Sequence, residues 1–239
     1  MTPKWTIVLI HFSRIIAAMD SVATPPSEFS RVRRLPARAA YDRATVEAIL
    51  DAAMIGHVGV ARQGRPVVIP MLFGRVDDHL YLHGSVASQL LRALGGGIDT
   101  CFTATVVDGL VYARSVFHHS MNYRSVVVAG VATEVEGDEK WRGLEAIVNH
   151  ITPGRFGEAR APSDRELRQT AVLRLPLTEA SAKVRTGGPV DETEDLDLPV
   201  WAGVVPIAPA FAPATDADDL AAPVPVSAAV ARLVASRPL

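Results

Sequence analysis

The segment His83–Gln89 is the part of this sequence best suited to bind an anion. The apolar run 80–82 stops at Gly84, and Ser85-x-x-Ser88 is typical of the start of a helix. A serine at the N-cap accepts a hydrogen bond from one exposed amide, and the other unpaired amides and the helix dipole attract negative charge. Two interpretations stay open here: an ordinary strand-to-helix turn capped by Ser85, and a phosphate site.

A second polar segment, Arg114–Ser125, lies between apolar strands. It contains two arginines, two histidines, an asparagine, a tyrosine and three serines. Burying such groups costs free energy unless a polar partner satisfies them. A phosphorylated ligand with a flat ring would do so, since Arg124 can form charge-assisted hydrogen bonds and the apolar strand 67–71 can lie along the ring. The alternative is an exposed hairpin loop.

Other kinds of chemistry find little support in the sequence. There is no Gly-x-Ser-x-Gly motif for a hydrolase, and no supported cysteine–histidine pair. His118 and His119 are neighbours, so on a strand their side chains point in opposite directions, and no carboxylate completes a ligand set with His79 and His83. We therefore expect no metal site, and no side chain is an obvious acid or base catalyst.

The composition predicts a globular domain with a full core. The chain has 239 residues, is 49% hydrophobic and carries a formal net charge of −2, which gives no electrostatic footprint for nucleic acid. The one cysteine, Cys101, excludes an internal disulfide framework and favours a reducing compartment, so we expect a cytoplasmic protein. The apolar run 5–10 is too short to span a membrane and is interrupted by His11.

Three regions follow from these patterns. Residues 1–34 are expected to be a disordered extension, with Met19 as a plausible true start and an export signal as the alternative; residues 35–206 form the domain, and residues 207–239 form an Ala/Pro-rich tail. Helices are expected over 41–53, 85–94 and 137–151, with a capping box at 163–166, and strands over 55–60, 66–73, 79–82, 99–107, 110–117, 124–135, 172–175 and 180–184.

The pattern of these elements favours a mainly β fold of the α+β class. About six strands at short spacing, with one helix inserted after the third, predict a small antiparallel barrel with peripheral helices. The Asp108-Gly109 pair is expected to be the hairpin turn between two of the longer strands.

Three segments resemble the flavin-nucleotide-binding branch of the pyridoxamine 5′-phosphate oxidase-like superfamily, which includes nitroimidazole-resistance proteins. They are Ile69-Pro70-Met71 with the 80–88 segment, the 108–126 block, and the 181–187 segment with Trp201-Ala202-Gly203. The resemblance covers roughly residues 35 to 206. It implies an FMN-binding split β-barrel whose homodimer holds FMN at the subunit interface.

The resemblance also implies roles for single residues. Ile69, Pro70 and Met71 would line the isoalloxazine ring. The ribityl-phosphate end would meet His83, Gly84, Ser85 and Ser88, and Gln89 stands where many relatives have a basic residue, so the phosphate would depend on backbone amides and on Arg124 or Arg92. The pocket would be completed by Asn122, Tyr123, Arg124 and Ser125 and closed by Lys183, Arg185 and Trp201.

The function expected from this resemblance is that of an FMN-dependent reductase or oxidase acting on a small electron-poor molecule, with the cofactor supplying the chemistry. Two alternatives stay open: a split-barrel protein that binds deazaflavin or haem, for which His118 and His119 are the reason, and a non-catalytic flavin-binding or storage protein. Neither nucleic acid nor a membrane is expected as a partner.

Overall fold

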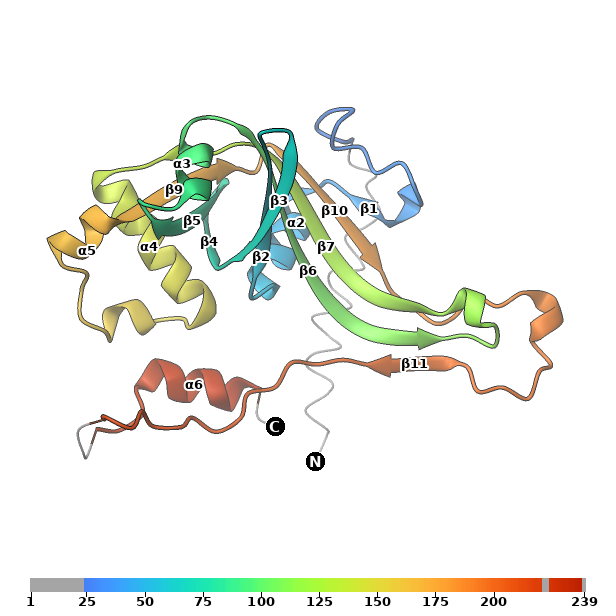
Figure 1. The fold of residues 1–239 in the computed structure, drawn as a ribbon. Coiled ribbons are helices and arrows are strands. Elements are labelled where there is room, and N and C mark those ends of the chain that lie inside the picture. Colours follow the sequence, from blue (N-terminus) through green and yellow to red (C-terminus); the bar gives the residue numbers. More distant parts are fainter. Residues whose placement is uncertain (1–23, 221–223, 238–239) are drawn as a thin grey trace.

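The structure is a computed structural model that describes residues 24–220 and 224–237. The expectations for residues 1–18 therefore lie outside the described residues. Two antiparallel sheets face each other and are flanked by helices, with a long arm extending to one side (Figure 1). The predicted fold class, α+β with a split barrel, is confirmed, and the described strands do not close into a complete barrel.

The larger sheet has seven strands and carries most of the predicted site. Its order is β1 (Ala39–Ala40), β10 (Glu179–Arg185), β7 (Ser120–Val131), β6 (Asp99–Tyr112), β2 (Gly56–Arg62) and β3 (Arg65–Met71), with β11 (Gly203–Pro206) also paired to β6. The smaller sheet has the order β4 (Phe73–Val76), β5 (His79–Ser85), β9 (Thr170–Pro176) and β8 (Thr133–Glu134). The edge strand β3 is thus left open on one side.

The helices surround these sheets. They are α2 (Arg43–Ala52), α3 (Gln89–Gly95), α4 (Gly137–Ile151), α5 (Asp164–Gln169) and α6 (Ala228–Ser236), with short 3₁₀ turns η1 (Pro36–Arg38), η2 (Val116–His118), η3 (Arg155–Gly157) and η4 (Thr193–Asp195). Within the predicted tail, α6 is attached to η3 because the amide of Ala229 donates to Glu158 at 2.9 Å. Among the described helices, none combines the length and apolar character that a membrane crossing requires.

One apolar core fills the space between the sheets. Strand periodicity explains its composition, because alternate side chains of each strand point inward. In β10, Ala180, Ala182 and Val184 are buried, whereas Ser181 and Lys183 are only half-buried. Phe73 of the smaller sheet and Phe102 of the larger one meet edge to face with ring centroids 5.0 Å apart. This contact joins the two sheets at the centre of the core.

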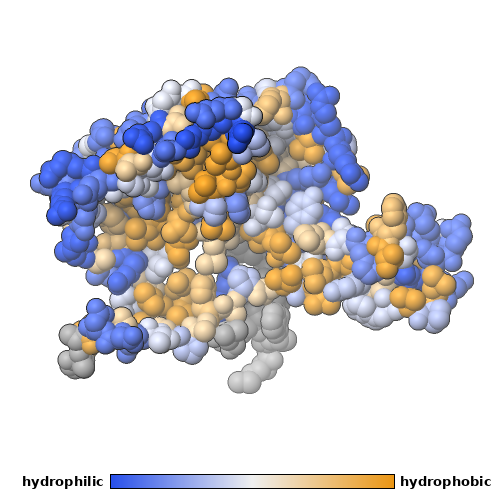
Figure 2. Space-filling view, viewed as in Figure 1, coloured by the Kyte–Doolittle hydropathy of each residue, from blue (hydrophilic) through white to orange (hydrophobic). Residues whose placement is uncertain are grey.

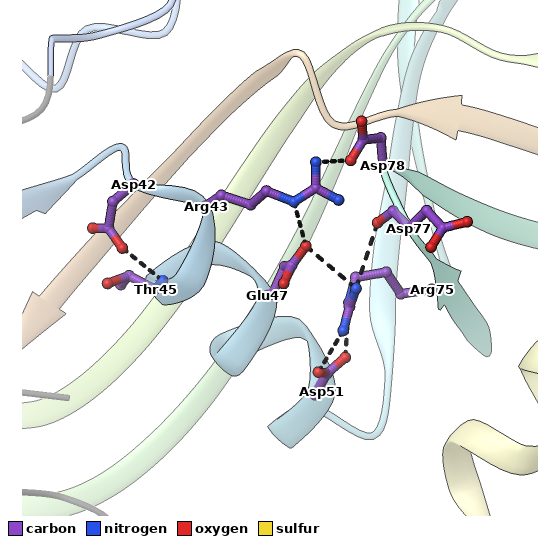
Figure 3. A network of polar contacts seen from close by, with 8 residues as sticks. All are labelled: Asp42, Arg43, Thr45, Glu47, Asp51, Arg75, Asp77 and Asp78. Atoms are coloured by element: carbon purple, nitrogen blue, oxygen red, sulfur yellow. Dashed lines mark hydrogen bonds and ion pairs between the residues drawn. The ribbon is translucent and has the colours of Figure 1, made fainter. Parts of the chain in front are cut away.

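Ion pairs attach α2 to the smaller sheet (Figure 3). Arg75 of β4 binds Asp51 in bidentate fashion, at 2.9 and 2.7 Å, and also lies 3.4 Å from Glu47. Arg43 pairs with Asp78 in the turn between β4 and β5. Asp42 caps the helix by accepting from the amide of Thr45 at 2.8 Å.

The arm consists of the outer halves of β6 and β7 with β11 alongside (Figure 1). The predicted hairpin turn at Asp108-Gly109 was wrong, since β6 continues through both residues. A β-bulge between Val107 and Gly109 accommodates the extra residue, and the carboxylate of Asp108 binds Arg124 on the neighbouring strand. The chain reverses instead around η2, where Ser115 caps the turn.

We expect Gly74→Ala to destabilise the protein by about 1–3 kcal/mol, the usual cost of overpacking a core. A β-carbon at Gly74 would lie 2.4 Å from the backbone carbon of Ala146 in α4, so the helix would have to move. Urea unfolding measures this change. Gly157→Ala is the matched control, because nothing lies within 4 Å of its β-carbon position. Equal effects of the two substitutions would contradict close packing of α4.

Candidate functional site

The turn after β5 differs in detail from the predicted helix start. Ser85 was wrongly predicted as the N-cap; it is still in β5, paired with Thr170, and its hydroxyl accepts from the amide of Ala87 at 3.2 Å. Ser88 is the N-cap of α3 and accepts from the amide of Leu91 at 3.4 Å. Strand pairing keeps Ser85 extended, so the N-cap lies three residues later than predicted and α3 begins at Gln89.

Two arginines lie beside this turn. Arg62, at the end of β2, donates to the side-chain oxygen of Gln89, and Arg92 donates to the carbonyl of Ala87 at 3.2 Å. They place positive charge at the position where Gln89 lacks it. The sequence analysis names Arg92 but misses Arg62; its position just before the Gln63-Gly64 turn is the signal that could have indicated it.

His83 has an unusual environment. It lies on β5, is half-buried, and its Nδ1 atom is buried without a hydrogen-bond partner. Burial lowers the pKa of His83 from its ordinary value of 6.5, so the ring is neutral at physiological pH. Within the residues that the structure describes, this nitrogen can therefore still accept a partner.

The predicted ring-binding residues lie on the open edge strand β3. Ile69 and Pro70 are exposed and Met71 is half-buried, and Val68 beside them is 61% exposed. The register pairs Arg65 with Arg62 at one end of β3 and Met71 with Gly56 at the other. With about 3.3 Å per residue, Ile69 lies about 13 Å along the strand from the Arg62 end. An elongated ligand with a ring at one end and a phosphate at the other fits this spacing.

The pairing of β7 with β10 gathers the second group of predicted residues. Asn122 donates to the carbonyl of Gly187 at 3.1 Å and accepts from Arg185. Ser125 donates to the carbonyl of Lys183 at 3.5 Å. Tyr123 pairs in register with Arg185. These side chains lie at the base of the arm.

The remaining predicted residues contact other residues of the same chain. Arg124 binds Asp108 in bidentate fashion at 2.9 and 2.8 Å, with both side chains largely buried. Lys183 donates to the carbonyl of Arg34 at 3.0 Å. Trp201 is 65% exposed and lies beside Tyr112, with ring centroids 5.9 Å apart.

One chain does not enclose all of these residues in a single pocket. The turn after β5 belongs to the smaller sheet, whereas the Asn122 group belongs to the larger one. Two surface cavities of about 510 and 320 Å³ are lined by residues of α4, and none of the predicted site residues lines either. The candidate site is therefore an open surface in one copy of the chain.

Asp108→Asn tests the role of Arg124. We expect a loss of about 1.5–3 kcal/mol of stability, because the substitution weakens charge-assisted hydrogen bonds to a largely buried guanidinium. Urea unfolding measures it, and Glu192→Gln is the control, since that carboxylate is exposed and its ion pair in the described part of the chain is with His118 at 3.4 Å. An unchanged stability together with altered flavin affinity would instead assign Arg124 to the ligand.

The fold and this open surface define the class of protein. Residues 42–184 match the family described as pyridoxamine 5′-phosphate oxidase. The chain belongs to this family. No curated protein matches it closely enough to add a more specific assignment.

Two solved structures are similar over nearly their whole length. The flavocytochrome Anf3 from Azotobacter vinelandii is 38% identical, with a TM-score of 0.83, over 88% of this chain and 98% of that one. The FAD and haem binding protein from Mycobacterium smegmatis is 36% identical, with a TM-score of 0.79, over 82% and 97%.

A more distant similarity covers less of this chain. A candidate 5-nitroimidazole antibiotic resistance protein from Bacteroides thetaiotaomicron is 26% identical, with a TM-score of 0.51, over 61% of this chain and 86% of that one. This similarity agrees with the branch of the superfamily that the sequence motifs indicate.

Proposed function

We propose that this protein binds a flavin nucleotide and haem and transfers electrons between them. The observation that carries the proposal is the similarity, at 38% and 36% identity over nearly their whole length, to a flavocytochrome and to a protein that binds FAD and haem. The haem alternative that the sequence left open is thereby favoured over deazaflavin and over simple flavin storage.

The open face of β3 and the arginines at its hairpin end suit a flavin nucleotide. Exposed Ile69 and Pro70 offer an apolar surface to a flat ring, and Arg62 and Arg92 offer positive charge to a phosphate. The sequence predicts FMN, whereas the relative from Mycobacterium smegmatis is named for FAD. We therefore propose the dinucleotide, and chromatography of the extracted cofactor distinguishes the two.

His83 is the residue we propose as a haem ligand. Among the described histidines it alone has a buried nitrogen without a partner, and its ring is neutral. His118 pairs with Glu192, and Nδ1 of His119 lies 3.1 Å from the carbonyl of Ser115, so both have partners within the arm. A neutral imidazole is the form that binds iron.

The residues of the chain would position the cofactors and control their surroundings. When bound, a flavin exchanges two electrons with a donor and a haem accepts them one at a time. His83 keeps its lone pair available because burial disfavours protonation. The apolar side chains of β3 exclude water from one face of the ring. No described side chain needs to act as an acid or base, and the electron acceptor we propose is a small electron-poor molecule.

We also propose a homodimer in which a second copy covers the arm. Figure 2 shows apolar side chains gathered over the arm. Val116 and Phe117 are each 86% exposed, and Trp201, Met121 and Val205 are exposed beside them. Exposed apolar patches of this kind are typical of protein interfaces. Sedimentation equilibrium tests the proposal, and a monomer at micromolar concentration would contradict it.

The visible spectrum of the purified protein tests the proposed function. We expect both flavin bands and a haem Soret band, with the flavin released on denaturation and identified by chromatography. Anaerobic addition of a chemical reductant should bleach the flavin and shift the Soret band. A colourless protein that binds neither added FAD, added FMN nor added haem would overturn the proposal.

A further inference from the structure

We propose that Arg185, together with Asn122, forms a binding site for an anionic group, either a carboxylate or a phosphate, of a bound ligand. The inference rests on the proposed function, since it assigns a subsite for the flavin or the haem. It is separate from the Arg62 and Arg92 position described above. The site lies at the end of β10, where the larger sheet continues into the arm.

Burial distinguishes Arg185 from the other arginines of the described chain. It is 5% exposed and is the only arginine among the buried residues described. Three half-buried arginines each bind a carboxylate: Arg75 binds Asp51, Arg114 binds Asp191 and Arg124 binds Asp108. Arg185 forms no ion pair with a carboxylate in the described residues.

The groups around Arg185 are neutral acceptors. Nη1 donates to the side-chain oxygen of Asn122 and, at 3.3 Å, to the carbonyl of Gly187, while Nη2 donates to the carbonyl of Gly188 at 3.1 Å. Nε is buried and has no partner. A buried guanidinium is costly without negative charge nearby, and no carboxylate of the described residues compensates the charge of Arg185.

A second positive charge increases the need for an anion. Burial, and then the like charge of Arg38, lower the pKa of Arg185, while the phenol of Tyr123 acts in the opposite direction. Arg38 also forms no ion pair within the described residues. Arg38 thus adds to the positive charge near Arg185, and arginine is the residue best suited to bind phosphate or carboxylate groups.

The loop that covers Arg185 can give an anion access. Thr186, Gly187 and Gly188 are exposed, and open space surrounds the β-carbon positions of both glycines. Gly187 has a φ of 93°, a conformation that favours glycine. The carbonyls of Gly187 and Gly188 accept hydrogen bonds from the same N–H groups of Arg185 that an anion would use. An anion adds the attraction of opposite charges to the hydrogen bonds that a neutral carbonyl can form, so exchange favours the anion.

Arg185→Gln tests the site by equilibrium binding. Four probes are titrated into the cofactor-free protein: FAD, riboflavin, haem, and haem dimethyl ester, in which both carboxylates are blocked. If the anion is a flavin phosphate, we expect FAD to bind about tenfold to a hundredfold more weakly and riboflavin to be unchanged. If the anion is a haem carboxylate, Arg185→Gln should bind haem more weakly by that factor and should bind haem dimethyl ester as tightly as the wild-type protein does.

Controls separate an anion site from a structural role. Arg185→Lys retains the charge and should recover most of the affinity, and Arg75→Gln, on the other sheet, should leave all four affinities unchanged. Thermal unfolding establishes that each variant is folded. Unchanged affinity of Arg185→Gln for every probe would overturn the proposal and leave Arg185 with the sole role of holding the glycine loop.

A last measurement keeps this inference separate from the proposed function. If the wild-type protein binds neither flavin nor haem, the proposed function fails, and inorganic pyrophosphate becomes the probe. Stabilisation of the wild-type protein, but not of Arg185→Gln, against thermal unfolding would then support the anion site. Equal effects of pyrophosphate on both would overturn it.

Discussion

His83→Ala should abolish haem binding while leaving flavin binding and the fold intact. The buried Nδ1 atom of His83 has no partner in the described chain, and its ring is neutral because burial lowers its pKa. If haem iron takes this imidazole as a ligand, the substitution would remove a bond that would hold the metal. Removal of a half-buried ring without hydrogen bonds costs the fold little by comparison with this loss.

The measurement is the ratio of Soret absorbance to flavin absorbance after reconstitution with both cofactors. The ratio should fall to the background of free haem in His83→Ala, and addition of imidazole should partly restore it. His119→Ala serves as the control, since its ring is held at the arm by the carbonyl of Ser115. Loss of the Soret band in His119→Ala and its retention in His83→Ala would assign the ligand to the arm.

The same residue predicts the pH dependence of stability. The folded-state pKa of His83 lies below its ordinary value of 6.5, so the unfolded chain binds the proton more readily. The contribution of His83 to the free energy of unfolding is therefore fully present above about pH 6.5 and is lost as the pH falls below that value. Haem should be released over the same range, and urea unfolding of His83→Ala should lack this contribution.

Local pattern predicted most of the barrel but not the exact course of the chain. Period-two alternation identifies strands such as β10 because one face of each is buried. The turn at Asp108-Gly109 was predicted from residue type alone, and the pairing of Asp108 with Arg124 on the neighbouring strand prevents it. Ser85 was predicted as a cap for a similar reason, although pairing with Thr170 keeps it in β5. Tertiary contacts decided both cases.

The candidate site was predictable in its composition and less so in its arrangement. The register of β7 and β10 pairs Tyr123 with Arg185 and so brings Arg185 beside Asn122, which no local pattern reveals. Arg124 has the charge expected of a phosphate ligand, yet its main partner is Asp108. Arg185, at a position where strand alternation predicts an exposed side chain, is buried instead. Arg185 therefore departs from the alternation that the rest of β10 follows.

Gly56→Ala and Phe102→Leu should each destabilise the protein, and together they should cost less than their sum. A β-carbon at Gly56 would lie 2.1 Å from the Cζ atom of Phe102, whose ring is fully buried between the sheets. The added methyl group therefore forces the ring against Phe73, at a cost of about 1–3 kcal/mol. Phe102→Leu alone leaves a cavity in the same place.

In the double variant the new methyl group occupies part of the space that the ring has left, so overpacking and cavity offset each other. Urea unfolding of the four proteins should give a favourable coupling of about 0.5–3 kcal/mol. Gly143→Ala is the matched control: its β-carbon would meet Tyr81 and Val172 in the separate cluster beside α4. Its cost should add to that of Phe102→Leu within about 0.5 kcal/mol. If the free-energy changes of Gly56→Ala and Phe102→Leu also add, the sheets must separate to relieve the contact with the new methyl group. The edge-to-face pair of Phe73 and Phe102 would then not determine the distance between the sheets.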